Sequence, residues 1–226
     1  MRKSSAKTAA ARSERRSASP RPQLLGSFDR ELAQARDQAR KRRDCPLWKN
    51  ATQTVFGEGA RATSIMLIGE QPGDQEDLNG RPFVGPAGRV LDRALRDAGI
   101  ERGATYVTNA VKHFKFEPRG KRCIHKKPTD MEIAACRQWL ERELAIVDPA
   151  VVVALGATAA RAVFNRPTAV GRTRGRVIPA AEARTFANAD VLVTVHPSYL
   201  LRAPSEDRQA HYQQFVADLK LLKRYV

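Results

Sequence analysis

Long apolar runs, cysteines and acidic side chains are all scarce in this sequence. No apolar run approaches the roughly 20 residues that a membrane-spanning helix needs, and no apolar signal core follows the basic N-terminus. The chain of 226 residues has three cysteines, an odd number and too few for a disulfide framework. We therefore expect a soluble cytoplasmic protein whose cysteines are buried thiols or metal ligands.

Acidic residues are few relative to basic ones. There are 40 Lys and Arg against 24 Asp and Glu, which gives a net charge of +16. A balance this basic favours a polyanionic partner over a small neutral metabolite, and nucleic acid is the leading candidate. Arginines scattered over a solvated surface would produce the same charge, so charge alone leaves that alternative open.

Large apolar residues are nearly absent from residues 1–26, which are rich in Ser, Ala, Arg and Pro. Such a segment cannot bury enough surface to offset its chain entropy, so we predict a disordered basic tail. Residues 27–226 have the length of one domain, and the chain is 42% apolar. Ser27 suits the N-cap of a first helix, which we expect to run towards Arg43.

Four apolar runs are typical of buried strands, at residues 64–68, 104–111, 150–155 and 191–195. Helical patterns follow at about 86–98, from a capping box at 129–132 to about 146, and from 205 to about 225. This alternating order implies parallel strands with helices on both faces. We predict an α/β fold, a three-layer α/β/α sandwich with a central, mainly parallel four-stranded sheet.

Polar loops follow the four predicted strands and therefore meet at one rim of the sheet. They begin with residues 69–73, Asn109, residues 156–158 and residues 196–198. Ligand sites of open α/β sheets form at this rim. An asparagine can accept from one ring N–H and donate to a neighbouring carbonyl, and uracil presents that edge. The rim is therefore the candidate active site.

Four motifs together resemble the uracil-DNA glycosylase superfamily, nearest to its iron-sulfur family-four branch. They are GEQPG at 69–73, GRPFVG at 80–85, YVTN at 106–109 and HPS at 196–198. The resemblance spans about Cys45 to Arg202. A basic insertion at 121–126, KRCIHK, resembles the KRRIH loop of the UdgX subgroup. Members of that subgroup excise uracil and stay covalently attached to the abasic DNA through the loop histidine, here His125.

The resemblance implies a role for each site residue. His125 is the implied nucleophile, and Glu70 would stabilise the sugar cation, orient His125, or both. His196 and the backbone N–H of Gln71 are the implied donors to the uracil oxygen. Phe83 would stack on the base, and Asn109 would read its edge. The full set of implied substrate contacts is Gln71, Asp74, Asp77, Phe83, Asn109, Ser198 and Arg202.

The resemblance also implies a 4Fe–4S cluster, and here the sequence departs from the family. The four ligand positions are occupied by Arg42, Cys45, His113 and Cys136. Histidine can ligate iron in such clusters, whereas arginine is not a plausible ligand. Either three residues hold the cluster with a missing or substituted fourth ligand, or the cluster is lost; Cys123 lies in the wrong loop to replace it. We expect a labile cluster.

Other interpretations of these residues stay open. Without the resemblance, His125 would belong to a solvated, phosphate-contacting loop. Two functional alternatives are a family-four enzyme that turns over through water and a non-catalytic binder of uracil-containing DNA. A nucleotide-phosphate enzyme is disfavoured because no P-loop motif follows the first strand. The expected partner is uracil-containing DNA, preferably single-stranded, bound by a monomer without involvement of a membrane.

Overall fold

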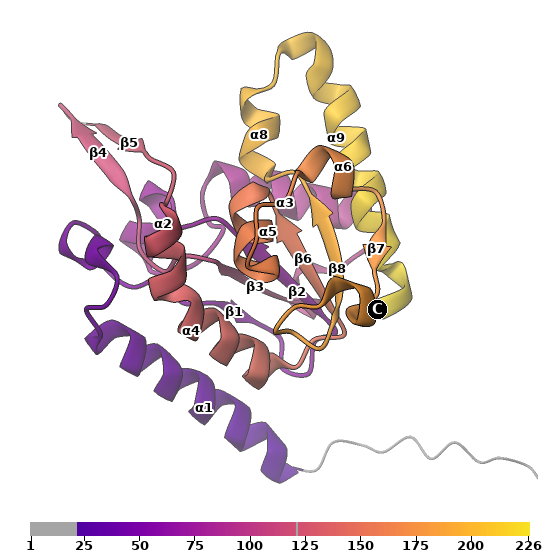
Figure 1. Cartoon of the computed structure of the whole chain (residues 1–226). Helices are drawn as coiled ribbons and strands as arrows, with labels where there is room; N and C mark the ends of the chain where they lie inside the picture. Colours follow the sequence, from indigo (N-terminus) through magenta and orange to yellow (C-terminus); the bar gives the residue numbers. More distant parts are fainter. Residues whose placement is uncertain (1–21, 121) are drawn as a thin grey trace, which may run out of the picture.

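The central sheet has six strands in the order β1-β3-β2-β6-β8-β7 (Figure 1). The computed structural model describes residues 22–120 and 122–226. The four inner strands are parallel: β2 (Ile65–Gly69), β3 (Thr105–Asn109), β6 (Val151–Leu155) and β8 (Asp190–Thr194). They confirm the predicted parallel sheet. The antiparallel edge strands β1 (Glu58–Gly59) and β7 (Val177–Ile178) were not predicted, because strands this short leave no periodic pattern.

Helices cover both faces of the sheet, as the predicted three-layer fold requires. One face carries α1 (Pro22–Lys41), α4 (Asp130–Val147) and α5 (Ala157–Phe164), and the other carries α3 (Pro86–Asp97) and α9 (Ser205–Lys220). In Figure 1, α1 and α4 lie side by side below the sheet. None of the helices in the described ranges is long and apolar enough to cross a membrane.

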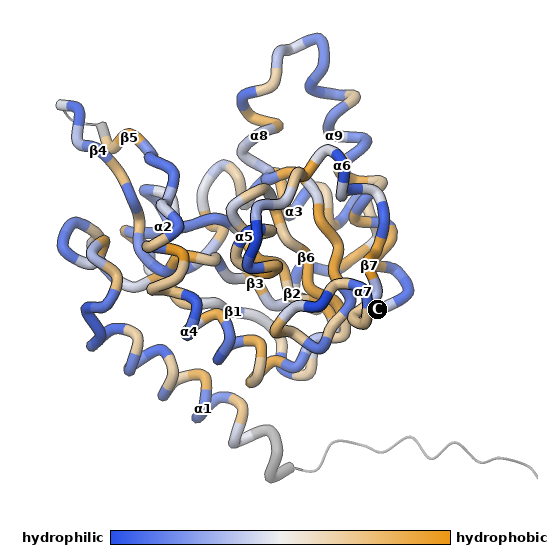
Figure 2. The backbone as a smooth tube through the Cα atoms, in the orientation of Figure 1, coloured by the Kyte–Doolittle hydropathy of each residue, from blue (hydrophilic) through white to orange (hydrophobic). Residues whose placement is uncertain are grey.

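Side chains of the inner strands alternate between two apolar cores. In β2, Met66 and Ile68 belong to the core that includes α1 and α4, while Ile65 and Leu67 belong to the core that includes α3 and α9. Successive side chains of a strand point to opposite faces, so a strand with helices on both sides is apolar throughout. Figure 2 shows this as hydrophobic colour along β6 and β8.

The N-terminal boundary differs from the prediction. The helix expected to start at Ser27 begins at Pro22, so the last residues of the predicted tail are helical. A proline is compatible with the first turn of a helix because its missing N–H would have no partner there. Residues 1–21 of the predicted tail lie outside the described residues.

The basic loop around His125 is a β-hairpin, which the sequence analysis did not predict. Strand β4 (Phe116–Arg119) pairs antiparallel with β5 (Arg122–His125), and Gly120 has a φ of 59°. Such a φ is typical of tight hairpin turns, which favour glycine. The hairpin projects from the body of the protein (Figure 1), so neither strand has the apolar pattern of a buried one. The remaining elements are α2 (Asp74–Asn79), α6 (Val170–Thr173), α7 (Ala180–Ala183), α8 (Pro197–Arg202) and 3₁₀ turns at Pro46–Lys49, Arg102–Ala104 and Leu221–Tyr225.

A buried ion pair joins the end of β3 to α4. Lys112 and Glu143 are both fully buried and directly bonded to each other. The Lys112 ammonium also donates to the Asn109 carbonyl at 2.7 Å and to Thr108 Oγ1 at 2.7 Å. The Glu143 carboxylate accepts from the Tyr106 hydroxyl at 2.9 Å. These bonds satisfy the charged groups, as buried charges require, and they fix the backbone where β3 ends.

Breaking this pair should destabilise the fold. We expect Lys112→Met to lower the free energy of unfolding by about 3–5 kcal/mol, because it leaves the Glu143 carboxylate buried without its counter-charge. Urea unfolding of both proteins measures the loss.

The exposed pair of Arg176 and Glu182, at 3.0 Å, provides the control. Arg176→Met should cost less than about 1 kcal/mol, since exposed ion pairs contribute little. If Lys112→Met and Arg176→Met lowered the free energy of unfolding equally, the role assigned to the buried pair would be wrong.

Candidate active site

The carboxyl ends of the parallel strands meet at a pocket of about 640 Å³. Glu70 follows β2, Asn109 ends β3, and His196 comes after β8. The pocket is lined by Glu70, Gln71, Gly73, Asp74, Gln75, Glu76, Phe83, Pro86, Ala87, Asn109, His125, Lys127, His196, Ser198, Leu201 and Arg202. This set includes every predicted catalytic and substrate-contacting residue except Asp77. The rim identified from the sequence is therefore one continuous cavity, with the hairpin on one side and α8 on the other.

The floor of the pocket depends on the absence of a side chain at Gly69. A Cβ there would lie 2.3 Å from Asn109 Oδ1 and 2.6 Å from Phe83 Cζ, so no other residue fits without displacing both. Phe83 has a φ of 56°, which is uncommon for a residue with a Cβ. A Cβ at Gly88 would lie 1.7 Å from the Phe83 carbonyl oxygen. Two glycines thus permit a strained backbone that places an aromatic ring beside the Asn109 amide.

His196 is oriented by the first turn of α8. Its Nδ1 accepts from the Ser198 backbone N–H at 3.2 Å and lies 2.8 Å from the Ser198 hydroxyl. Burial, with smaller contributions from the charges of His125 and Arg202, lowers the pKa of His196 to about 4. The ring is therefore neutral at pH 7, and because Nδ1 accepts, Nε2 carries the proton. The Phe83 and His196 rings are stacked with their centroids 6.0 Å apart.

The Gln71 side chain attaches the hairpin to the pocket. Its Oε1 accepts from the Lys115 N–H at 3.1 Å, and its Nε2 donates to the Lys115 and Lys126 carbonyls at 3.2 and 3.0 Å. The same Nε2 lies 2.8 Å from His125 Nε2. An amide N–H₂ only donates, so its two hydrogens are shared among these three acceptors and His125 Nε2 is the unprotonated nitrogen of the ring. The sequence analysis assigned only the backbone N–H of Gln71 a role, and nothing in the motif indicated this clamp.

The Glu70 carboxylate lies between His125 and Thr158. Its Oε1 lies 3.7 Å from His125 Nε2, and its Oε2 accepts a hydrogen bond from Thr158 Oγ1 in the first turn of α5. Burial lowers the pKa of His125, the Glu70 carboxylate raises it, and Arg202 lowers it. The net direction is downward, so the imidazole is neutral at physiological pH.

Asp77, named among the substrate contacts from the sequence, does not line the pocket. Its Oδ2 accepts from the Thr52 N–H at 2.8 Å, and only 4% of the residue is exposed. Asp77 therefore fixes the segment around Thr52 against α2. Glu76, which the sequence analysis missed, holds both sides of the pocket entrance: its carboxylate accepts from the N–H groups of Gly73 at 3.1 Å and Gly85 at 2.7 Å.

The rim of the pocket is cationic. Arg202 on α8 and Lys127 after β5 both line it, and both are exposed. Leu201 beside them is 45% exposed. Arg202 was expected from the resemblance, whereas Lys127 was not, because one lysine in a run of basic residues carries no distinguishing signal. The rim can contact a phosphate backbone.

Three metal-ligating side chains form a separate buried group. The ligand atoms of Cys45, His113 and Cys136 all lie within 4.8 Å of one another. A hydrogen bond from the Cys136 thiol lowers the pKa of Cys45 to about 5. His113 Nε2 lies 3.0 Å from Thr54 Oγ1, and His113 Nδ1 is buried without a hydrogen-bond partner. The three residues are those that the sequence analysis named.

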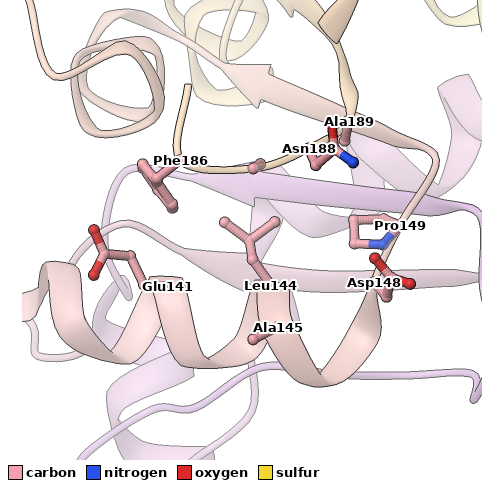
Figure 3. A pocket seen from close by; sticks show the side chains of 9 residues that line it. Glu141, Leu144, Ala145, Asp148, Pro149, Phe186, Asn188 and Ala189 are labelled. Atoms are coloured by element: carbon pink, nitrogen blue, oxygen red, sulfur yellow. The ribbon is translucent and has the colours of Figure 1, made fainter. Parts of the chain in front are cut away.

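A second pocket, of about 470 Å³, lies at the amino ends of β6 and β8 (Figure 3). Leu144 occupies its middle, between Glu141 and Asp148. Glu141 is paired with Arg137 at 2.6 Å. This end of a parallel sheet is not where ligand sites form, and the polar groups do not converge, so we do not assign it a function.

Comparison with known proteins relates this chain to one family. The family described as "Uracil DNA glycosylase superfamily" matches residues 56–220. The Type-4 uracil-DNA glycosylase of Thermotoga maritima is 42% identical over 164 residues, covering 72% of this chain and 79% of that protein. The Type-4 enzyme of Archaeoglobus fulgidus is 36% identical over 166 residues, covering 72% and 79%. A Type-5 uracil-DNA glycosylase of Pyrobaculum aerophilum is 34% identical over 155 residues, covering 60% and 62%.

The burial and hydrogen bonds of His196 predict the pH at which its ring titrates, which NMR can measure. We expect the His196 ring to titrate at about pH 4, with its proton on Nε2, because burial opposes the charged form and Nδ1 accepts from Ser198. In urea the same ring should titrate near the ordinary value of about 6.5. The unfolded chain then takes up the proton first, so this group lowers the free energy of unfolding as the pH falls from about 6.5 to about 4. A midpoint near 6.5 in the folded protein, or a proton on Nδ1, would contradict the assignment.

Proposed function

The chain belongs to the uracil-DNA glycosylase superfamily, and we propose that it excises uracil from DNA and then captures the abasic product covalently through His125. Excision is the reaction for which the Type-4 relatives are named. Capture is supported by the resemblance of residues 121–126 to the UdgX loop. The observation that carries it is the position of an unprotonated His125 Nε2 in the pocket, 3.7 Å from Glu70.

Base recognition comes first. A base inside a duplex is out of reach, so the substrate is single-stranded DNA or a flipped nucleotide. Phe83 offers a stacking surface, and the Asn109 amide can accept from uracil N3–H and donate to uracil O4. Cytosine presents the opposite pattern on that edge, so it would leave the Asn109 amide, which is 3% exposed, unpaired.

Bond cleavage follows from stabilisation of the leaving group. When the C1′–N1 bond breaks, uracil takes the electron pair and its carbonyl oxygens become more negative. The Nε2–H of neutral His196 points away from Ser198 and is available to donate to such an oxygen. Because the ring is already oriented, the hydrogen bond strengthens in the transition state without reorganisation.

Capture replaces the attack of water. The sugar left behind is a cation at C1′, and His125 Nε2 forms a bond to it with its lone pair. In the free protein that lone pair accepts from Gln71, so the Gln71 contact is exchanged for the carbon. The resulting imidazolium loses its Nδ1 proton to solvent. Glu70 stabilises the sugar cation first and the imidazolium next, since its carboxylate faces the attacking nitrogen.

The proposed partner is uracil-containing DNA, preferably single-stranded, bound by one copy of the protein. Arg202 and Lys127 at the pocket rim supply phosphate contacts, and the net charge of +16 adds a long-range attraction. The basic segment 1–26 is a second candidate for nonspecific phosphate contacts.

The family's 4Fe–4S cluster does not fit the residues present. A cluster of this type takes four ligands, and the described part of the chain brings three together, Cys45, His113 and Cys136. At the fourth position Arg42 is a cation that pairs with Asp44 at 3.4 Å. No step of the proposed reaction passes through a cluster.

Substitution of His125 separates capture from excision. We expect His125→Ser to abolish the covalent protein–DNA adduct and to release uracil in multiple turnovers, because water then reaches the sugar cation while the base pocket is intact. A denaturing gel and a uracil-release assay measure the two activities.

Two further variants make the result specific. Cys123→Ser, two residues away on β5, should still form the adduct, whereas Asn109→Ala should depress excision and adduct formation together by roughly 100-fold. Persistence of the adduct in His125→Ser would assign the attachment to another nucleophile. Catalytic uracil release without any adduct in the unmodified protein would favour turnover through water.

The close approach at Gly69 predicts a second loss of activity. Gly69→Ala should reduce uracil excision by roughly 100-fold, because its methyl group must displace Asn109 Oδ1 and the Phe83 ring. Gly103→Ala is the matched control, since a Cβ there has no atom within 4 Å and should leave excision unchanged. Full activity in Gly69→Ala would rule out a base pocket at this position.

A further inference from the structure

The buried group of Cys45, His113 and Cys136 joins three segments that are distant in the sequence. Cys45 follows α1, His113 follows β3, and Cys136 lies in the second turn of α4. All three are buried, at 6%, 7% and 1% exposure. None of them lines the pocket of the proposed reaction.

The spacing of the donor atoms distinguishes a single ion from a cluster. Tetrahedral geometry with Zn–S bonds of about 2.3 Å places two thiolates about 3.8 Å apart. The three donor atoms here all lie within 4.8 Å of one another. In a 4Fe–4S cluster each thiolate binds a different iron, so its ligand atoms are further apart than those of one ion. The group is compact enough for a single ion.

The surroundings of His113 also indicate a bound metal ion. Its Nε2 is engaged with Thr54 Oγ1 at 3.0 Å, which fixes the ring, while Nδ1 is buried and lacks any hydrogen-bond partner. A buried, unpaired ring nitrogen is costly unless something binds it. A metal-ligating histidine is typically held through its other ring nitrogen, which is the role that Thr54 has here.

The donor set selects the class of ion. Two thiolates and one imidazole are the ligands of zinc-type sites and not of magnesium or calcium sites. A divalent ion would balance the charge of two thiolates.

We propose that Cys45, His113 and Cys136 bind a single zinc-type divalent ion, with water in the fourth position, where the family has a cluster. The ion ties α1 and α4 to the segment that follows Asn109. It is independent of the uracil chemistry, because the three ligands lie outside the pocket, and its presence does not depend on whether His125 captures DNA.

Metal analysis of the full chain tests the proposal. The protein is purified from cells grown with both iron and zinc, and zinc, iron and acid-labile sulfide are measured. We expect about one zinc per chain and no sulfide. After removal of the metal, added Co²⁺ should give visible bands of a tetrahedral ion and a thiolate charge-transfer band. Iron with equimolar sulfide, or the absence of both bound metal and the cobalt bands, would overturn the proposal.

Variants locate the ion. Cys136→Ser and His113→Gln should lose the bound metal and the cobalt charge-transfer band or weaken metal affinity at least tenfold, while Cys123→Ser, an exposed thiol outside the group, should retain both. If a ligand variant does not fold, the cobalt spectrum of the unmodified chain still decides the question. Full metal retention in both ligand variants would place the ion elsewhere.

Discussion

The pairing of β2 with β3 at their carboxyl ends determines where the side chains of the pocket lie. In the parallel register Gly69 lies opposite Asn109, and the absence of a Cβ at Gly69 allows the Asn109 amide and the Phe83 ring to meet above it. The backbone continues the pairing beyond the strands, since the N–H of Val111 donates to the Glu70 carbonyl at 3.0 Å. The buried bond from Lys112 to the Asn109 carbonyl fixes the same turn. A rigid sheet edge therefore positions Asn109, the proposed base-reading residue, and loops supply the other pocket residues.

Two histidines in one pocket are suited to different tasks by their hydrogen bonds. His196 accepts at Nδ1 and has Nε2–H left to donate, which suits a leaving group that gains negative charge. His125 accepts at Nε2 from Gln71, and that nitrogen lies 3.7 Å from Glu70 Oε1, so its lone pair suits attack on a cation once the Gln71 contact is exchanged. Burial keeps both rings neutral at physiological pH, since it lowers both pKa values. Charge-neutral rings can thus act as donor and nucleophile within one cavity.

The inner strands of the sheet, and the positions of most residues that line the pocket, could be predicted from the sequence for physical reasons. Inner parallel strands are apolar on both faces, so they appear as unbroken runs, and the residues just after them lie at one rim. The hairpin that carries His125 was missed because it projects from the body and has no buried face. Lys112 and Glu143 were missed because a charged residue gives no sign in the sequence that it is buried, and its partner lies 31 positions away. The clamp made by the Gln71 side chain depends on hairpin placement, which no local pattern encodes.

In the proposed reaction one imidazole ends the sequence of steps by bonding to the sugar. Mass spectrometry of the protein after reaction with a single-stranded uracil oligonucleotide detects that bond. We expect a species with the mass of protein plus oligonucleotide less the released uracil, and, after digestion, a modified peptide in which the added sugar maps to His125. Unmodified protein accompanied by free abasic strand, or an adduct that maps to any other residue, would contradict the proposed reaction.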